Sequence, residues 1–256
     1  MKTICTTPSR KSNFRSAQID FLPSPLGEGK KKAAFTLAEV LITLGIIGVV
    51  AALTLPTLIQ NYHDKATITK LKKMYSTLQQ AYLMNKALDE IKLGNTQAHN
   101  AEAAQEIAAV FVPYLHISKD CGTDKPGCVN SGTYKYLSGS NATNYNYGGT
   151  AAYRVLLNDG SCIWFRRVNP SLLSAIFYDV NGENPPNMWG KDLFEFVVVN
   201  DRVLPTGIEG TERLFDTDCN PNGQGIGCAA WVLQQENFEY LKCSGLQLNG
   251  PKKKCN

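Results

Sequence analysis

A long uncharged segment near the N-terminus constrains this 256-residue chain more than any other feature. From Ala33 to His63 the only formally charged side chain is that of Glu39. An α-helix needs about 20 apolar residues to cross the hydrocarbon core of a bilayer, so this segment is long enough to span a membrane. The sequence therefore predicts a membrane-spanning helix over residues 35–60.

The residues on either side of this segment predict its orientation. Three lysines, Lys30–Lys32, come directly before it, and basic residues next to a membrane helix favour the cytoplasmic side. A secretory signal has a shorter apolar core followed by a cleavage site of small residues. Here the apolar run continues directly into an amphipathic pattern. We therefore expect one membrane crossing, with a cytoplasmic N-terminus and the rest of the chain outside.

Glu39 is the unusual residue of the segment. A carboxylate in a membrane helix costs free energy unless it has a partner, and intramembrane acids therefore usually face one. A position in the headgroup region would make the cost small. Two interpretations follow for Glu39: a headgroup position, or pairing with a cation.

The sequence "KKKAAFTLAEVLITLGIIGVVAALTLP" at residues 30–56 resembles the N-terminal segment of type IV pilins and of the pseudopilins of type II secretion. The shared pattern is a basic leader, a small residue, Phe-Thr-Leu-x-Glu and a long apolar helix. The resemblance implies a leader over residues 1–34, which a prepilin peptidase removes by cutting between Ala34 and Phe35. It also implies N-methylation of Phe35. The family usually has Gly before the cut, where this chain has Ala34.

The resemblance also implies how such a subunit assembles. In these filaments the acid, here Glu39, is thought to meet the cationic N-terminal amine of a neighbouring subunit, which would fix the register of the helices. Gly48 would let helices approach closely, or is simply a glycine that membrane helices tolerate. Pro56 lacks a backbone donor and should kink or locally melt the helix.

Partners and location follow from the same resemblance. The expected partners are other pilin-like subunits of the same filament, the prepilin peptidase and the bacterial inner membrane. The head would then lie in a periplasmic or surface filament, either a type II secretion pseudopilus or a type IV pilus. The alternative is a membrane-tethered extracytoplasmic binding or adhesion protein with a pilin-like anchor.

An amphipathic stem is predicted over residues 61–94, with Gly94 as the C-cap. Lysines 65, 70, 72 and 73 occupy its polar face. Apolar residues recur at mostly three or four positions along the other face and its approach: Leu58, Tyr62, Ala66, Leu71, Tyr75, Leu78 and Tyr82. One face of the stem should pack on a globular head.

The head, residues 95–256, is predicted to be α+β, with three to five antiparallel strands and helices on one side. A helix over 101–117 should break near Pro113, and residues 129–150 should form a loop. Turn residues at 158–160 and 200–201 predict two β-hairpins. The expected fold is therefore a long N-terminal helix packed on a small antiparallel sheet, stabilised by disulfides. Further strands are expected over 172–180 and 192–199, and a short helix over 228–238.

Seven of the eight cysteines lie beyond the apolar segment, as expected for a domain exported to an oxidising compartment. Cys121 and Cys128 bracket a Pro-Gly turn and suit a small disulfide loop. Cys219 and Cys228 enclose another turn-rich stretch. Cys243 and Cys255 are a further candidate pair, which would leave Cys162 as the odd thiol. Sequence does not determine the connectivity.

The stretch "DVNGENPPNMWGKD" at residues 179–192 resembles a loop of many pilin-like secretion proteins. Its oxygen-bearing side chains Asp179, Asn181, Asn187 and Asp192 are hard ligands that suit calcium. The alternative is a set of turns in which these side chains cap the backbone. A second stretch, from Asp218, begins like a calcium-binding EF-hand loop. Its twelfth position is Ala229, where a bidentate acid is required, so a turn is predicted there.

Charge and histidine content give no support for nucleic-acid binding or for catalysis. Residues 1–34 hold seven of the 26 Lys and Arg residues and two of the 22 Asp and Glu residues. The remaining chain is therefore nearly neutral, and no nucleic-acid partner is predicted. The three histidines are scattered, and no nucleophile triad, metal-spaced pair or phosphate loop is present. We expect no enzyme, and no cofactor other than calcium.

Overall fold

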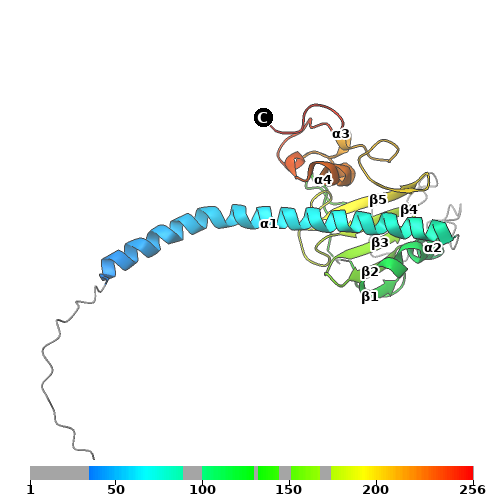
Figure 1. Ribbon diagram of the computed structural model, residues 1–256, viewed down its shortest axis with the longest axis horizontal. Coiled ribbons are helices and arrows are strands. Elements are labelled where there is room, and N and C mark those ends of the chain that lie inside the picture. Colours follow the sequence, from blue (N-terminus) through cyan, green and yellow to red (C-terminus); the bar gives the residue numbers. More distant parts are fainter. Residues whose placement is uncertain (1–34, 89–99, 130–131, 144–150, 168–173, 256) are drawn as a thin grey trace, which may run out of the picture. The chain divides into compact units, whose positions relative to one another are not determined.

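The computed structural model describes residues 35–88, 100–129, 132–143, 151–167 and 174–255 (Figure 1). The chain consists of two units, Met1–Ala51 and Ala52–Asn256. The predicted leader over residues 1–34, including the cleavage residue Ala34, lies outside the described residues. So does the predicted end of the stem at Gly94.

In the first unit, the chain forms the beginning of helix α1, which spans Leu37–Leu88. Every side chain from Phe35 to Val50 is exposed. By length and composition α1 can cross a membrane, and the most apolar part of it is entirely unburied within the chain. These features confirm the predicted long apolar N-terminal helix.

Pro56 does not melt α1, which contradicts one part of the prediction. The helix is continuous through Pro56. A proline removes one backbone donor, and the helical bonds on either side can persist around a single missing one. Nearby, the Thr57 hydroxyl donates to the carbonyl oxygen of Thr54 at 2.9 Å, a bond within the same continuous helix.

The second half of α1 packs one face on the head. Its buried residues recur at the three- and four-residue spacing of a helix stripe: Ile68, Leu71, Met74, Leu78, Ala81, Tyr82 and Asn85. Tyr75 stacks on Phe196 of the sheet, with 5.6 Å between the ring centroids. Leu58 and Tyr62 stay exposed, because the head covers α1 only from about Asp64 onwards.

The head contains one sheet of six strands in the described residues, all antiparallel and in sequence order. The strands are β1 (Ile117–Gly122), β2 (Tyr153–Leu157), β3 (Cys162–Arg166), β4 (Ser174–Asp179), β5 (Leu193–Val199) and β6 (Arg202–Pro205). Both predicted hairpins are present as β2–β3 and β5–β6. Edge strand β1 was not predicted, because three exposed residues, Ser118, Lys119 and Asp120, conceal its strand pattern.

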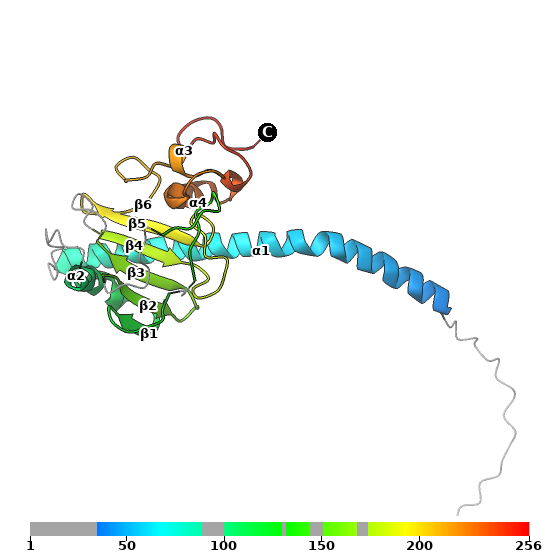
Figure 2. The same cartoon turned by 180° about the vertical axis from the view of Figure 1, so that it is seen from behind.

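Helices α1 and α2 (Ala101–Phe111) cover one face of the sheet, as comparison of Figures 1 and 2 shows. Asn100 caps α2 by accepting a hydrogen bond from the Ala103 amide. The helix then gives way to a 3₁₀ turn, η1 (Val112–Tyr114), which contains the predicted break at Pro113. Phe111 stacks on Phe165 of β3 with 5.6 Å between the ring centroids.

Among the described residues, loops rather than helices cover the opposite face of the sheet. Trp164 and Phe177 point to this face and pack with Tyr134 and Trp189 in a second core. The short helices α3 (Phe215–Asp218) and α4 (Ala229–Gln235) follow β6 and lie beyond the β5–β6 side of the sheet (Figure 2). The 3₁₀ turns η2 (Ile226–Cys228) and η3 (Glu239–Leu241) flank α4.

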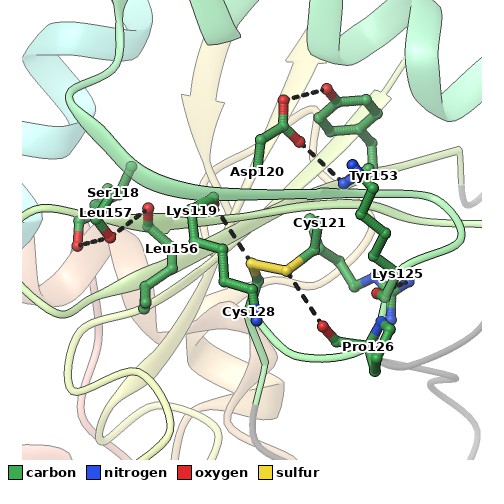
Figure 3. Close-up of a disulfide and its surroundings, with 12 residues drawn as sticks. Ser118, Lys119, Asp120, Cys121, Lys125, Pro126, Cys128, Tyr153, Leu156 and Leu157 are labelled. Atoms are coloured by element: carbon green, nitrogen blue, oxygen red, sulfur yellow. Dashed lines mark hydrogen bonds between the residues drawn. A yellow bond between two sulfur atoms is a disulfide. The ribbon is translucent and has the colours of Figure 1, made fainter.

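The head contains three disulfides, at the predicted pairs: Cys121–Cys128, Cys219–Cys228 and Cys243–Cys255. Cys162 is a buried free thiol. The first disulfide closes the turn that follows β1 (Figure 3). Beside it, the Tyr153 hydroxyl donates to Asp120 at 2.7 Å and ties β2 to the edge strand.

Candidate functional site

Thr36 and Glu39 close the first turn of α1. The backbone amide and the hydroxyl of Thr36 donate to Glu39 Oε2 at 2.9 and 2.8 Å, and the Glu39 amide donates back to the Thr36 hydroxyl at 3.2 Å. This reciprocal arrangement is a capping box. Sequence reasoning overlooked it, although the Thr-x-x-Glu spacing is readable. Within the single chain the Glu39 carboxylate therefore already has hydrogen-bond donors.

The two glycines of the apolar segment have no close neighbours within the chain. A methyl group added at Gly45 or Gly48 would meet no atom of the described residues within 4 Å. Glycine lowers the stability of a helix interior relative to alanine. Close packing inside the described chain therefore does not explain glycine at these positions.

A second candidate site lies where β4 ends and β5 begins. The β4–β5 loop, residues 180–192, contains three of the four predicted calcium ligands and directly follows Asp179. Its ends meet, because the Val180 amide donates to the Asp192 carbonyl oxygen at 2.9 Å. The side chains of Asp179 and Asp192 are both buried, with 0% and 4% of their surface exposed. Two carboxylates are thus held close together inside the protein.

Backbone and hydroxyl donors surround both carboxylates. Asp179 accepts from the Tyr134 hydroxyl at 2.5 Å and from the amides of Asn181 and Gly182 at 3.2 and 3.0 Å. Asp192 accepts from the amides of Asn187 and Met188 at 2.7 and 2.6 Å. These contacts confirm the predicted turn-capping role of the two aspartates.

Burial and mutual repulsion act against ionisation of this pair. Burial raises the pKa of Asp179 well above its ordinary value, and the nearby charge of Asp192 raises it further. Burial also raises the pKa of Asp192, although the amides of Met188 and Asn187 favour its charged form. Two carboxylates that share a buried site therefore disfavour each other's ionised form.

The two asparagines show what turn capping leaves unexplained. Asn181 Oδ1 and Asn187 Oδ1 are both buried and accept no hydrogen bond from any described residue. Asn187 has only 8% of its surface exposed, and its backbone amide contacts Asp192. The Asn181 side chain also lies beside Asp192, whose pKa it lowers. A buried acceptor without a partner costs about 1–3 kcal/mol, so turn capping does not account for these two oxygens.

The four predicted ligands all carry oxygen donors of the kind that a hard cation prefers. Within the described parts of the chain, no three His, Cys, Asp or Glu side chains group closely enough to hold a metal ion. A site here therefore combines two carboxylates with two amide oxygens, the kind of oxygen set that Ca²⁺ accepts. A cavity of about 530 Å³ borders the loop and is lined by Asn181, Lys191, Asp192 and residues of the Gln60–Thr67 part of α1.

The loop conformation depends on residues that tolerate a positive φ. Asn187 has a φ of 52°, a left-handed conformation that asparagine adopts more readily than most residues. Gly182 has a φ of 65°, and a Cβ there would lie 2.1 Å from the carbonyl oxygen of Gly160. The β2–β3 turn therefore packs directly against the backbone of the β4–β5 loop.

Comparison with known proteins supports the assignment of the N-terminal segment. Residues 29–55 match the prokaryotic N-terminal methylation motif, the signature of type IV pilins and pseudopilins. No curated protein and no solved structure matches the chain. Residues 57–235, more than half of the chain, match a second family. The protein therefore has a pilin-like N-terminus and belongs to the family described as "Family of unknown function (DUF6613)".

Proposed function

We propose that this protein is a structural rather than catalytic subunit of a type II secretion pseudopilus or a type IV pilus. In this proposal a prepilin peptidase cuts between Ala34 and Phe35. Before assembly the subunit is inserted in the inner membrane, with its head outside the cytoplasm. The observation that carries the proposal is the methylation motif at the start of a fully exposed apolar helix. Such a surface needs either lipid or neighbouring helices around it.

Glu39 has the chemistry to join neighbouring subunits. Removal of the leader would create a cationic amine at Phe35, four residues before Glu39. The capping box uses Glu39 Oε2, and an ionised carboxylate has about four acceptor positions on its two oxygens. The carboxylate can therefore cap its own helix and still accept a hydrogen bond from the amine of a neighbour. Opposite charges in a low-dielectric surrounding would stabilise this pairing.

Two substitutions separate the cap from the charge. Glu39→Gln keeps a capping box, which accepts Glu or Gln at this position, but removes the negative charge. Thr36→Ala removes the two hydrogen bonds of the cap that need the Thr36 hydroxyl, and keeps the charge. We expect both variants to insert in the membrane, and expect only Glu39→Gln to lose incorporation into filaments. Normal incorporation of Glu39→Gln would show that Glu39 only caps the helix, whereas a wild-type chain that never enters filaments would favour a tethered binding or adhesion protein.

The processing step is tested separately by mass spectrometry of the mature N-terminus. The expected result is a chain that begins with N-methylated Phe35. A chain that retains residues 1–34 in cells with an active peptidase would contradict the proposal.

We also propose that the head binds Ca²⁺ through Asp179, Asn181, Asn187 and Asp192. The observation that favours this second function is the buried, unpaired Oδ1 of Asn187. Ca²⁺ would supply the missing partner for both amide oxygens and would offset the repulsion between the two carboxylates. Its role would be to stabilise the β4–β5 loop.

Thermal unfolding of the detergent-solubilised full chain tests this binding. A ligand bound only to the folded state stabilises it by about 2.7 kcal/mol at one hundred times its dissociation constant. For a chain of this size that corresponds to about 5–10 °C between excess Ca²⁺ and chelator. An unchanged midpoint for the wild-type protein would rule out the proposed site.

Asn187→Gly is the informative variant, because glycine keeps the left-handed backbone and removes the unpaired oxygen. It should abolish the calcium-dependent shift while staying folded in chelator. Asn184→Ala is the matched control, since Asn184 is an exposed residue of the same loop. This control should keep the full shift.

A further inference from the structure

Tyr134 contacts the proposed calcium site from a distant part of the chain. Its hydroxyl donates to Asp179 Oδ2 at 2.5 Å, and both side chains are fully buried. The other oxygen of Asp179, Oδ1, accepts from the amides of Asn181 and Gly182. Three donors thus fix the orientation of a carboxylate that has about four acceptor positions. The remaining acceptor capacity is available to a cation.

Lys135, the residue after Tyr134, forms backbone hydrogen bonds beside a second proposed ligand, Asn187. The Lys135 amide donates to the carbonyl oxygen of Asn187, and the Trp189 amide donates to the carbonyl oxygen of Lys135, each at 2.9 Å. These two bonds lie on either side of Met188, the residue that directly follows Asn187. Two consecutive residues therefore fix Asp179 through a side chain and Asn187 through the backbone.

Both contacts belong to a small hairpin, residues Tyr134–Ala142, which we call the Tyr134 hairpin. Lys135 pairs with Asn141, and the Ala142 amide donates to the Tyr134 carbonyl oxygen at 2.8 Å. The hairpin also reaches the Cys219–Cys228 loop, because the Ser138 amide donates to the Gly223 carbonyl oxygen at 3.0 Å. It therefore links the β4–β5 loop to a disulfide-bonded part of the head.

Packing does not explain the hydroxyl group of Tyr134. The ring lies in the second core beside Trp164, with 6.1 Å between the ring centroids. A phenylalanine would fill the same volume and make the same apolar contacts. The hydroxyl adds the hydrogen bond to Asp179, whose orientation matters most when that carboxylate holds a ligand.

We infer that Tyr134 is a positioning residue of the calcium site and that bound calcium in turn holds the Tyr134 hairpin against the β4–β5 loop. This inference rests on the proposed calcium binding. The coupling is reciprocal, because a contact that favours calcium must itself be favoured by calcium. Tyr134→Phe should weaken calcium affinity by about 10–100-fold, as is typical when a partner of a metal ligand is removed.

Tyr136→Phe provides the matched control. Tyr136 is a buried tyrosine of the same hairpin, but the charged groups near its hydroxyl are Arg213 and Asp218 rather than the four proposed ligands. Both substitutions remove one oxygen atom from a buried ring. A difference in metal affinity between them therefore reports on the contact with Asp179 and not on general loss of packing.

The test uses the detergent-solubilised full chain with Tb³⁺ as a luminescent substitute for Ca²⁺. Tryptophan is excited, since Trp189 lies two residues from Asn187, and Ca²⁺ is added in competition. Wild type and Tyr136→Phe should bind with similar affinity, and Tyr134→Phe should bind about 10–100-fold more weakly. Hydrogen exchange on the wild type should show slower exchange of the Lys135 and Trp189 amides with Ca²⁺ than with chelator.

The outcomes distinguish the proposed calcium binding from the proposed role of Tyr134. Absence of saturable Tb³⁺ binding to the wild type would overturn the calcium site, and the role of Tyr134 with it. Equal affinities of Tyr134→Phe and wild type, with binding lost in Asn187→Gly, would overturn the role of Tyr134 alone. Amide exchange that is the same with Ca²⁺ and chelator would overturn the coupling to the hairpin. This last measurement needs no variant, so it decides the question even if Tyr134→Phe does not fold.

Discussion

The ammonium group of Lys70 donates a hydrogen bond to the carbonyl oxygen of Val180, with 3.0 Å between the two atoms. It also donates to the carbonyl oxygen of Asp159 at 3.2 Å. One side chain of α1 thus holds the start of the β4–β5 loop and the β2–β3 turn. The stem therefore supports the loop that contains the proposed calcium ligands.

Replacing Lys70 by Met should therefore destabilise the head. A hydrogen bond to a charged group contributes about 1.5–3 kcal/mol when buried, and the partial exposure of Lys70 reduces this to about 1–2 kcal/mol. Urea denaturation measures the loss. Lys73→Met, at an exposed position one turn along the same helix, should change stability by less than half as much. Equal effects of the two variants would contradict a specific role for Lys70.

Glu195 should make the head less stable as the pH rises. Burial raises the pKa of Glu195 to about 8, and Glu212 contributes in the same direction while Arg213 opposes it. Between its ordinary pKa of 4.5 and 8, the folded chain retains a proton that the unfolded chain releases. The free energy of unfolding should therefore fall as pH increases through this range, by up to about 1.4 kcal/mol per pH unit.

Glu195→Gln isolates this contribution, because glutamine cannot ionise. Urea denaturation from pH 5 to pH 8 should show a shallower decline for the variant than for the wild type. Parallel stability curves would mean that Glu195 keeps the same proton occupancy in both states.

Gly48→Ala should leave the isolated subunit as stable as before, or slightly more stable. Alanine is favoured over glycine in a helix by about 0.5–1 kcal/mol, and the added methyl meets no atom of the chain. If helices of neighbouring subunits approach at Gly48, the same methyl should reduce filament formation. Val49→Leu, one position along the helix, is the control and should assemble normally. Unimpaired assembly of Gly48→Ala would argue against close approach there.

Removing the Cys243–Cys255 disulfide by a double substitution to Ala should lower the free energy of unfolding. Closing a loop of this length restricts the unfolded chain by about 3 kcal/mol in the chain-entropy description. Denaturant unfolding under oxidising conditions measures the loss. In a reducing buffer the wild type should approach the variant, and a difference that persists after full reduction would point to packing of the two cysteines instead.

Local patterns predicted the elements whose physical causes are local. The apolar run of α1 and the turns at Asn158–Gly160 and Asn200–Asp201 needed no tertiary information. At Asn200 and Asp201 both φ values are positive, as a tight hairpin turn between twisted strands requires. Strand β1 was not predicted, because it is an edge strand whose solvent-facing residues are polar.

The candidate site was only partly predictable, because local sequence patterns do not show which distant residues meet in the folded chain. Spacing identified Asp179, Asn181, Asn187 and Asp192 as oxygen donors, but the folded chain shows which donors already have partners. Tyr134 lies 45 positions before Asp179, in a stretch whose polar composition indicated only a loop. Its contact depends on the path of the whole sheet, and no local pattern encodes it.

The order of the six strands has a consequence for how the head forms. Each strand pairs with the strand next to it in sequence, so no pairing has to wait for a distant segment. Such neighbour-to-neighbour connections favour rapid folding. If the N-terminus stays in the cytoplasm and the rest of the chain crosses the membrane in sequence order, the second half of α1 would emerge before the strands, and the sheet could then grow on it strand by strand. The topology thus suits vectorial folding, in which each new edge is covered as soon as the next strand emerges.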